Sequence, residues 1–230
     1  MQKDGAISVI IPVFREQETI NRYLGFLKAI FLSPGHEIIV VDGSFHAESI
    51  KAIQVPGIRT VHSKPGRGAQ MNAGAGAAAG RILVFVHADT ILPAKAPELI
   101  IKALEETNIS AGAFSLGIDS GRTSLKLVAM AANLRTWWTR VPYGDQAIFM
   151  SRDYFFCIGG FMEIPLMEDL ELMTRIRKRK DKVRILPQKV LTSSRRWNKE
   201  GVFRCTLRNW FIRVLYHFGV SPDSLKKLYK

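Results

Sequence analysis

Residues 6–14 read AISVIIPVF, an almost unbroken run of β-branched and other apolar side chains. A strand covered on both faces has this composition, whereas a strand with one solvent-facing side alternates apolar and polar residues. Two later runs are of the same kind, EIIVV at residues 37–41 and RILVFVH at residues 81–87. The three runs therefore predict buried strands at the centre of a largely parallel sheet.

Helical patterns separate these strands. Residues 18–31 repeat apolar side chains at the spacing of one helical face, and a Pro-Gly pair closes the segment. A shorter strand at residues 58–62 precedes a Gly/Ala-rich helix at residues 67–79. This alternation is typical of βαβ units, so we expect an α/β protein with a single Rossmann-like, mostly parallel central sheet and flanking helices. Ligands of such sheets bind beyond the carboxyl ends of the strands.

The second half of the chain is less regular but continues without a break. It predicts strands at residues 111–118, 146–150 and 183–191, and helices at residues 125–138, 169–179 and 202–218. No segment is rich enough in Pro, Gly or Ser to act as a linker between domains. We therefore expect one domain over residues 1–230.

The net charge of +13 is concentrated at one end of the chain. Residues 1–170 contain equal numbers of basic and acidic side chains, so residues 171–230 carry the whole excess. A neutral body with a basic end suggests contact with an anionic group such as a diphosphate, lipid head groups or a nucleic acid. A basic surface that is only solvated is an open alternative.

The chain shows no targeting or membrane-spanning pattern. No basic stretch followed by an apolar run opens the sequence, and no run of about 18 apolar residues occurs in it. Cys157 and Cys205 lie far apart and form no metal or redox motif, which is typical of two buried thiols in a reducing compartment. We expect a cytoplasmic protein, with peripheral attachment to a membrane as an open alternative.

Acidic residues follow the predicted strands. Glu16, Asp42 and Asp89 each come just after a strand, and Glu168-Asp169 opens a predicted helix. Each one alone is a common turn or helix-cap residue. Together they converge on one edge of the sheet, where they repel one another unless a cation or a polar ligand is present. The sequence therefore predicts a binding site at this edge.

The motifs occur in a recognisable order. A strand ending before Glu16 is followed by VVDGS, GRGAQMNAG, HAD, GGF with MED, and RRW. This order resembles the inverting glycosyltransferases of family 2, which have the GT-A fold, and the resemblance covers residues 6–218. Within that family the chain resembles a small soluble bacterial group. The resemblance implies transfer of a sugar from a nucleotide-diphosphate sugar, with UDP favoured, to an unidentified acceptor. It also implies a nucleotide-binding half over about residues 1–110 and an acceptor half over residues 111–230.

The resemblance assigns the donor site to a set of residues in the first half. Asp42 would accept a hydrogen bond from the donor base, because a carboxylate only accepts and so selects a ring N–H. Arg67 would pair with phosphate or stack on the base, although the segment around it can also be read as a close-packed Gly/Ala helix. The complete set is Pro12, Glu16, Asp42, Ser44, Gly66, Arg67, Gly68, Asn72, His87, Ala88 and Asp89.

The HAD motif corresponds to the family's metal motif, which is normally Asp-x-Asp. The resemblance implies that Asp89 binds Mg²⁺ or Mn²⁺, hard cations that bridge carboxylate and diphosphate oxygens. His87 stands where the first aspartate is expected. It is either a metal ligand, which suits Mn²⁺ better, or a contact to ribose or phosphate. A lone histidine that ends an apolar strand can also be structural.

The acceptor side is assigned to residues of the second half. Asp169 is the candidate general base for the acceptor hydroxyl, and Glu168 beside it should face a different direction. A helix N-terminal carboxylate stabilised by the macrodipole is the structural alternative for Asp169. The YGDQ segment also matches the smaller group, so Asp145 is expected to position an acceptor or a sugar hydroxyl, and Tyr143 is assigned to the diphosphate and acceptor region.

The RRW tripeptide resembles the end of a Gln-x-x-Arg-Trp motif, with Ser193 at the Gln position. Arg196, with Arg195 beside it, would contact the diphosphate, and Trp197 would line the acceptor channel. The missing Gln makes processive polymer synthesis doubtful.

The predicted helix at residues 202–218 gathers Phe and Trp on one side and carries several arginines. Such a helix either lies in a membrane interface or packs on the core of its own domain, and we expect the second.

Other functions fit parts of the sequence less well. An NAD-dependent enzyme needs a glycine fingerprint after the first strand, but PVFREQE contains no glycine. No P-loop occurs, and the glycine-rich, lysine-bearing loop of a nucleotidyltransferase is missing. A non-catalytic basic module for RNA or a membrane surface would leave the strand-end carboxylates unexplained. We therefore expect no nucleic-acid partner.

Overall fold

The computed structural model describes residues 5–229, and the runs predicted as buried strands form the middle of its sheet. β1 (Ile7–Val13) pairs in parallel with β2 (Glu37–Asp42) on one side and with β4 (Ile82–Phe85) on the other. β3 (Arg59–His62) extends this parallel part beyond β2. The carboxyl ends of β1 and β4 consequently lie next to each other.

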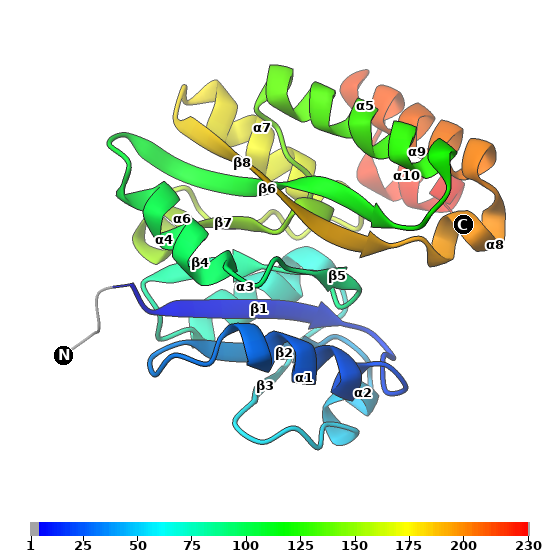
Figure 1. Cartoon of the computed structure of the whole chain (residues 1–230). Helices are drawn as coiled ribbons and strands as arrows, with labels where there is room; N and C mark the ends of the chain where they lie inside the picture. Colours follow the sequence, from blue (N-terminus) through cyan, green and yellow to red (C-terminus); the bar gives the residue numbers. More distant parts are fainter. Residues whose placement is uncertain (1–4, 230) are drawn as a thin grey trace.

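The second half of the sheet is mixed rather than parallel. β7 (Ile148–Ser151) runs antiparallel to both β4 and β6 (Ile109–Asp119). β8 (Lys182–Ser193) is parallel to β6, and the short β5 (Thr90–Ile91) is antiparallel to β8. The complete order is β3-β2-β1-β4-β7-β6-β8-β5 (Figure 1).

Both faces of the sheet are covered, which explains the continuous apolar strands. On one face α1 (Ile20–Ile30) and α4 (Ala96–Glu105) share a core with alternate residues of β1. On the other face α3 (Arg67–Ala77), α6 (Arg152–Cys157) and α7 (Glu168–Lys178) form a second core. The helix α4 has no counterpart among the predicted elements.

The remaining helices lie at the ends of the sheet. α2 (Glu48–Lys51) follows β2, and the 3-10 turn η1 (Gly144–Gln146) precedes β7. α5 (Thr123–Thr139), α8 (Arg195–Glu200), α9 (Val202–His217) and α10 (Pro222–Tyr229) gather beside the far ends of β6 and β8 (Figure 1). Within residues 5–229 no helix combines the length and the apolar character needed to cross a bilayer.

Two expectations about burial are wrong. Cys157 is exposed, and only Cys205 is a buried thiol. The apolar stripe of α9 does not pack on the core, because the buried residues of this helix are Cys205 and Ile212, whereas Phe203 and Trp210 are exposed. The stripe therefore faces away from the domain.

One side chain holds α3 against the segment that leads to α7. Asn72 Nδ2 donates a hydrogen bond to the carbonyl oxygen of Phe161 at 2.9 Å, and Asn72 Oδ1 accepts one from the Phe161 N–H at 2.9 Å. Phe161 is buried against Phe85 and Phe155. The segment around Phe161 is therefore held in place by backbone hydrogen bonds and by the packing of its side chain.

Asn72→Ala tests this connection. The substitution leaves the N–H and C=O groups of Phe161 without their partners, so we expect the free energy of unfolding to fall by about 2 kcal/mol. Urea denaturation measures the change. Asn198→Ala, an exposed residue of α8, is the control and should change stability by less than about 0.5 kcal/mol. Equal stability of the two variants would show that the connection contributes nothing.

Candidate active site

A cleft of about 650 Å³ lies at the carboxyl ends of β1 and β4. Its opposite wall comes from η1, the start of α7, and the helices α5, α8 and α9. The cleft brings together most of the predicted site residues from both halves of the chain. Those that line it are Pro12, Glu16, Arg67, His87, Ala88, Asp89, Tyr143, Asp145, Glu168, Asp169, Arg195, Arg196 and Trp197.

Asp42 does not line the cleft, and its carboxylate is fully occupied within the chain. Oδ1 accepts hydrogen bonds from the backbone N–H and the hydroxyl of Ser44, and Oδ2 accepts them from the N–H groups of Ser49 and Ile50. Burial would raise the pKa of Asp42, but these hydrogen bonds outweigh it and lower the pKa. A carboxylate has about four acceptor positions, so none is left for a donor base. Asp42 shapes the loop after β2, and Ser44 is buried with it.

The glycines of GRG have structural roles in this arrangement. A Cβ atom at Gly68 would overlap the carbonyl oxygen of Met162, so only glycine permits this approach of α3 to the chain before α7. Gly66 precedes α3 with a φ of 129°, a backbone conformation that favours glycine. Neither residue lines the cleft, and the same holds for Asn72.

Gln70 is a cleft residue that the sequence did not single out. Its Nε2 donates to the carbonyl oxygens of Val13 at 2.7 Å and Val41 at 2.8 Å, the ends of β1 and β2. This amide fixes the floor of the cleft. The only feature of the sequence that could have indicated Gln70 is its position in the first turn of a Gly/Ala-rich helix.

His87 lies just beyond β4 and carries a neutral ring. Burial, together with the positive charges of Arg67 and Arg196, lowers the pKa of His87 to about 3. Both arginines line the same cleft. A neutral imidazole can accept a hydrogen bond or bind a metal ion, which a protonated ring cannot do.

Gly144 brings the histidine and the candidate base together. Its N–H donates a hydrogen bond of 2.6 Å to Asp169 Oδ2, while Asp169 Oδ1 accepts one of 2.7 Å from the N–H of Leu170. A Cβ atom at Gly144 would lie 2.8 Å from His87 Nε2 and 3.2 Å from Asp169 Oδ2. The absence of a side chain therefore allows both groups to approach the space that a Cβ atom of residue 144 would fill.

Two other carboxyl groups of the cleft resist ionisation. Burial, and then the charge of Asp169, raises the pKa of Glu168 to about 7 and that of Asp145 to about 6. Glu168 has a distant ion pair with Arg67, 3.9 Å between Oε1 and Nη1, and Oδ1 of Asp145 has no hydrogen-bond partner among the described residues. Glu168 and Asp169 both line the cleft but have different neighbours.

Two arginines that line the cleft, one from α5 and one from α9, were not predicted as site residues. Arg135 of α5 lies 3.3 Å from the ring centre of Tyr143, and Arg213 of α9 lies 5.0 Å from the same centre. Burial, and then the charge of Arg213, lowers the pKa of Arg135 to about 10, so it remains charged. The two cations partly balance Asp145 and Asp169.

Comparison with known proteins identifies the family. The family model described as glycosyl transferase family 2 matches residues 8–164, which is more than half of the chain. The chain belongs to glycosyl transferase family 2. It is a glycosyltransferase, and its cleft is lined by residues from both halves of the chain.

Solved structures share the architecture. The chain is similar to a mannosyltransferase from Pyrobaculum calidifontis in complex with GDP-Man and Mn²⁺, with a TM-score of 0.67 and 19% identity over 97% of this chain and 67% of that chain. It is also similar to glucosyl-3-phosphoglycerate synthase from Mycobacterium tuberculosis in complex with Mn²⁺, UDP and phosphoglyceric acid. That likeness has a TM-score of 0.54 and 20% identity over 80% of this chain and 69% of that chain. At these identities the likeness establishes the GT-A fold. No curated protein matches the chain in sequence.

Glu168→Gln tests how much the burial of this carboxyl group in the cleft lowers the free energy of unfolding. A carboxyl group with a raised pKa is favoured in its protonated form, so its contribution to stability is present below its usual pKa of 4.5 and is lost as the pH rises through about 7. Across this range we expect the free energy of unfolding of the unaltered protein to fall by up to about 3 kcal/mol because of Glu168. The Glu168→Gln variant has no ionisable group at this position and should not show this fall.

Urea denaturation at a series of pH values provides the measurement. Glu105→Gln replaces an exposed carboxylate at the end of α4 and should keep the pH dependence of the unaltered protein. The prediction fails if Glu168→Gln also keeps that pH dependence.

Proposed function

We propose that the enzyme transfers a sugar from a nucleotide-diphosphate sugar, with UDP as the favoured nucleotide, to an acceptor hydroxyl with inversion at the anomeric carbon. One observation carries the proposal. Within a family 2 chain, the cleft sets His87 and Asp89 at the end of β4 against Asp145 and Asp169 on the opposite wall. A donor on one side and an acceptor on the other would meet between these pairs.

Recognition of the donor rests on the cations of the cleft. The positive charges of Arg67 and Arg196 both act on His87, so a positive potential is present beside the end of β4. A diphosphate placed there would be paired by guanidinium groups, which suit phosphate oxygens. Glu16 and Pro12 line the same side and are the proposed contacts to the nucleoside. Asp42 would act indirectly, by holding the loop after β2.

A divalent cation, Mg²⁺ or Mn²⁺, fits the donor side. Asp89 is an exposed carboxylate and His87 a neutral imidazole, and both line the cleft. Among residues 5–229 no three His, Cys, Asp or Glu side chains are grouped to hold a metal by themselves. Such a site suits an ion that takes its other ligands from substrate phosphates and water. When bound, the cation would neutralise charge on the departing diphosphate.

Asp169 is the proposed general base. An inverting transfer requires the acceptor hydroxyl to lose its proton while its oxygen attacks the anomeric carbon from the face opposite the diphosphate. Asp169 is oriented by the N–H of Gly144 and keeps acceptor positions free on its carboxylate. Asp145, whose Oδ1 has no partner among the described residues, is proposed to position the acceptor hydroxyl. Tyr143 and Trp197 would complete the acceptor side, and Arg195 would assist Arg196 at the diphosphate.

Asp89→Ala tests the donor side. We expect UDP binding to require Mn²⁺ or Mg²⁺ and to weaken by about 100-fold in Asp89→Ala, because a metal-binding carboxylate is lost. Isothermal titration calorimetry with and without Mn²⁺ measures this, and GDP in parallel tests the preference for UDP. Asp119→Ala, an exposed aspartate at the end of β6, is the control and should bind normally. Metal-independent binding of equal strength in Asp89→Ala would remove the metal assignment.

Asp169→Asn tests the acceptor side. The amide cannot take the proton, so we expect transfer to fall by at least about 100-fold while UDP affinity is unchanged. Asp145→Asn provides the comparison, since a positioning residue should mainly raise the KM for the acceptor. Single-turnover assays with a UDP-sugar separate these effects. An active Asp169→Asn enzyme beside an inactive Asp145→Asn enzyme would move the base to Asp145.

A further inference from the structure

The outer face of α5 is apolar from Leu127 to Trp138. Leu127, Met130, Leu134, Trp137 and Trp138 follow one another at the three- and four-residue spacing of a single helical face. All five are exposed. A helix on the surface of a domain normally turns such a stripe inward.

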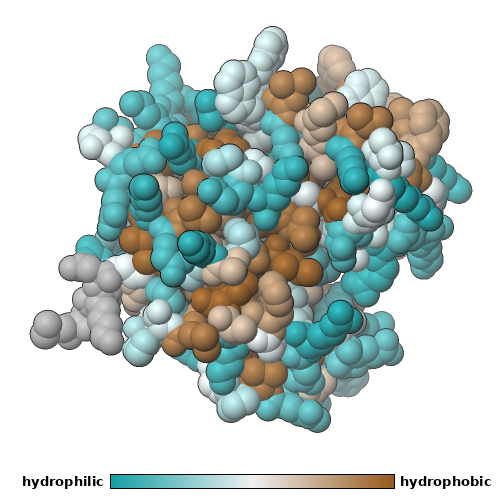
Figure 2. Space-filling view, viewed as in Figure 1, coloured by the Kyte–Doolittle hydropathy of each residue, from teal (hydrophilic) through white to brown (hydrophobic). Residues whose placement is uncertain are grey.

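The outer face of α9 repeats this arrangement. Phe203, Leu207, Trp210 and Phe211 share one side of the helix, Phe218 follows just beyond its end, and all five are exposed. α5 and α9 pack against each other, and Figure 1 shows them side by side at one end of the molecule. We call these ten residues the α5–α9 outer face. Hydrophobic residues gather over the same region in Figure 2.

The orientation of this face is fixed by contacts on the inner side. Asn133 Oδ1 accepts a hydrogen bond of 2.7 Å from the N–H of Leu116, and Asn133 Nδ2 donates one of 2.8 Å to the carbonyl oxygen of the same residue. These bonds hold α5 to β6. Thr136 on α5 is likewise buried and bonded to Gln146. The helix therefore cannot rotate its aromatic side chains inward without breaking them.

The charge around the face selects the kind of partner. Neither α5 nor α9 contains an aspartate or glutamate, and Lys126, Arg140 and Arg204 are exposed beside the apolar stripes. α10 packs against α9 and adds two exposed lysines and one aspartate. A second copy of the chain would bring two surfaces of the same sign together, which is unfavourable. An anionic surface would be attracted.

The inner sides of the same two helices line the cleft. α5 contributes Ala132 and Arg135 to it, and α9 contributes Ile212 and Arg213. A helix with its side chains is about 10 Å across, so the outer face lies roughly that far from the acceptor side of the cleft. A partner bound to the outer face is therefore held close to the side of the cleft at which the acceptor is proposed to bind.

We propose that the α5–α9 outer face docks on an anionic membrane surface. Exposed Trp, Phe and Leu with flanking Lys and Arg are the features of helices that lie in a membrane interface, where the rings enter the head-group boundary and the cations pair with anionic lipids. Large contiguous apolar patches on a soluble domain mark interaction sites. The proposal concerns binding and does not depend on the transfer reaction.

The test is co-sedimentation of the full chain with vesicles made of equal parts phosphatidylglycerol and phosphatidylcholine. We expect binding, a blue shift of tryptophan emission, and much weaker binding to phosphatidylcholine alone. The double variant Trp138→Ala/Phe203→Ala removes two side chains that are each 80% exposed, so folding should be unaffected. Vesicle affinity should fall by at least about tenfold.

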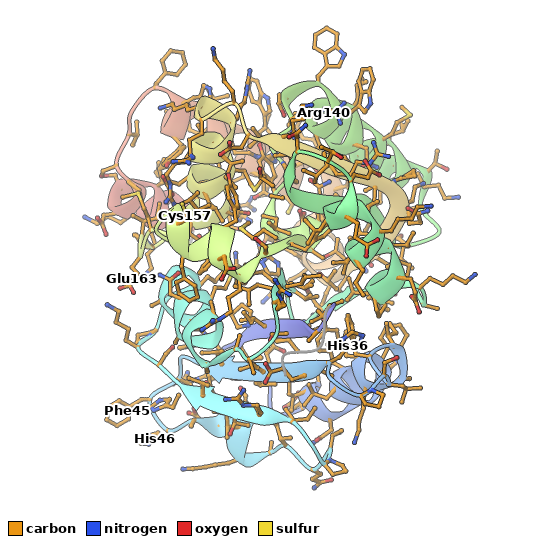
Figure 3. All side chains as sticks on the ribbon, turned by 90° about the vertical axis from the view of Figure 1, so that its left-hand side faces the viewer. His36, Phe45, His46, Arg140, Cys157 and Glu163 are labelled. Atoms are coloured by element: carbon orange, nitrogen blue, oxygen red, sulfur yellow. The ribbon has the colours of Figure 1, made fainter. Side chains whose placement is uncertain are left out.

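A matched control variant distinguishes binding through this face from non-specific hydrophobic binding. Leu32 and Phe45 are 73% and 88% exposed. Phe45 lies at the opposite end of the molecule from Arg140, which follows α5 (Figure 3). The control Leu32→Ala/Phe45→Ala should bind vesicles like the unaltered protein.

A second pair of double variants tests the contribution of the basic side chains to vesicle binding. Arg140→Gln/Arg204→Gln should weaken binding to the anionic vesicles by roughly tenfold or more, whereas Lys51→Gln/Lys102→Gln, elsewhere on the surface, should not. Added salt should weaken binding of the unaltered protein in the same direction.

Three outcomes would overturn the proposal. The first is no binding of the unaltered protein to anionic vesicles. The second is equal vesicle affinity of the Trp138→Ala/Phe203→Ala variant and its control. The third is self-association in analytical ultracentrifugation that this variant abolishes, which would assign the α5–α9 outer face to a second copy of the chain.

Discussion

The hydrogen bond from the N–H of Gly144 to Asp169 connects the parts of the molecule on which the cleft depends. It joins η1 to the first turn of α7, and the absence of a Cβ atom lets His87 approach the same glycine. Because β7 follows η1 directly and pairs antiparallel with β4, the sheet brings this glycine to the end of β4. The mixed sheet is therefore what brings His87 close to Asp169.

The electrostatics of the cleft follow from this crowding. Burial and the charge of Asp169 disfavour ionisation of Glu168 and Asp145, while Arg67 opposes the effect on Glu168. Carboxyl groups so close together stay charged more readily when a cation is added. The same site holds arginines beside a neutral His87, where an anion would be stabilised. A cation and a diphosphate that arrive together would thus satisfy both kinds of group, which neither would do alone.

The sequence could predict the strands of the first half because continuous apolar runs indicate burial on both faces. It could not predict the direction of β7, because a run of four residues carries no sign of which neighbour it joins. Asp42 and Asp89 look alike in the sequence, and both follow a buried strand. They differ because the N–H groups after β2 turn back onto Asp42, which is a property of the loop and not of the aspartate. Arg135 was missed because an arginine within a helix usually faces solvent.

The prediction that the apolar stripe of α9 packs on the core is wrong for a physical reason. The apolar side of a surface helix is assigned to the core on the assumption that the inside of a domain is apolar. Here the inner side of α5 and α9 lines the cleft, and it combines the polar Arg135, Asn209 and Arg213 with the small or aliphatic Val128, Ala132 and Ile212. The Trp and Phe residues of both helices lie on the outer side. When a helix also lines a cleft with charged side chains, a periodic apolar stripe therefore indicates which residues share a face, but it does not indicate that this face is turned toward the core.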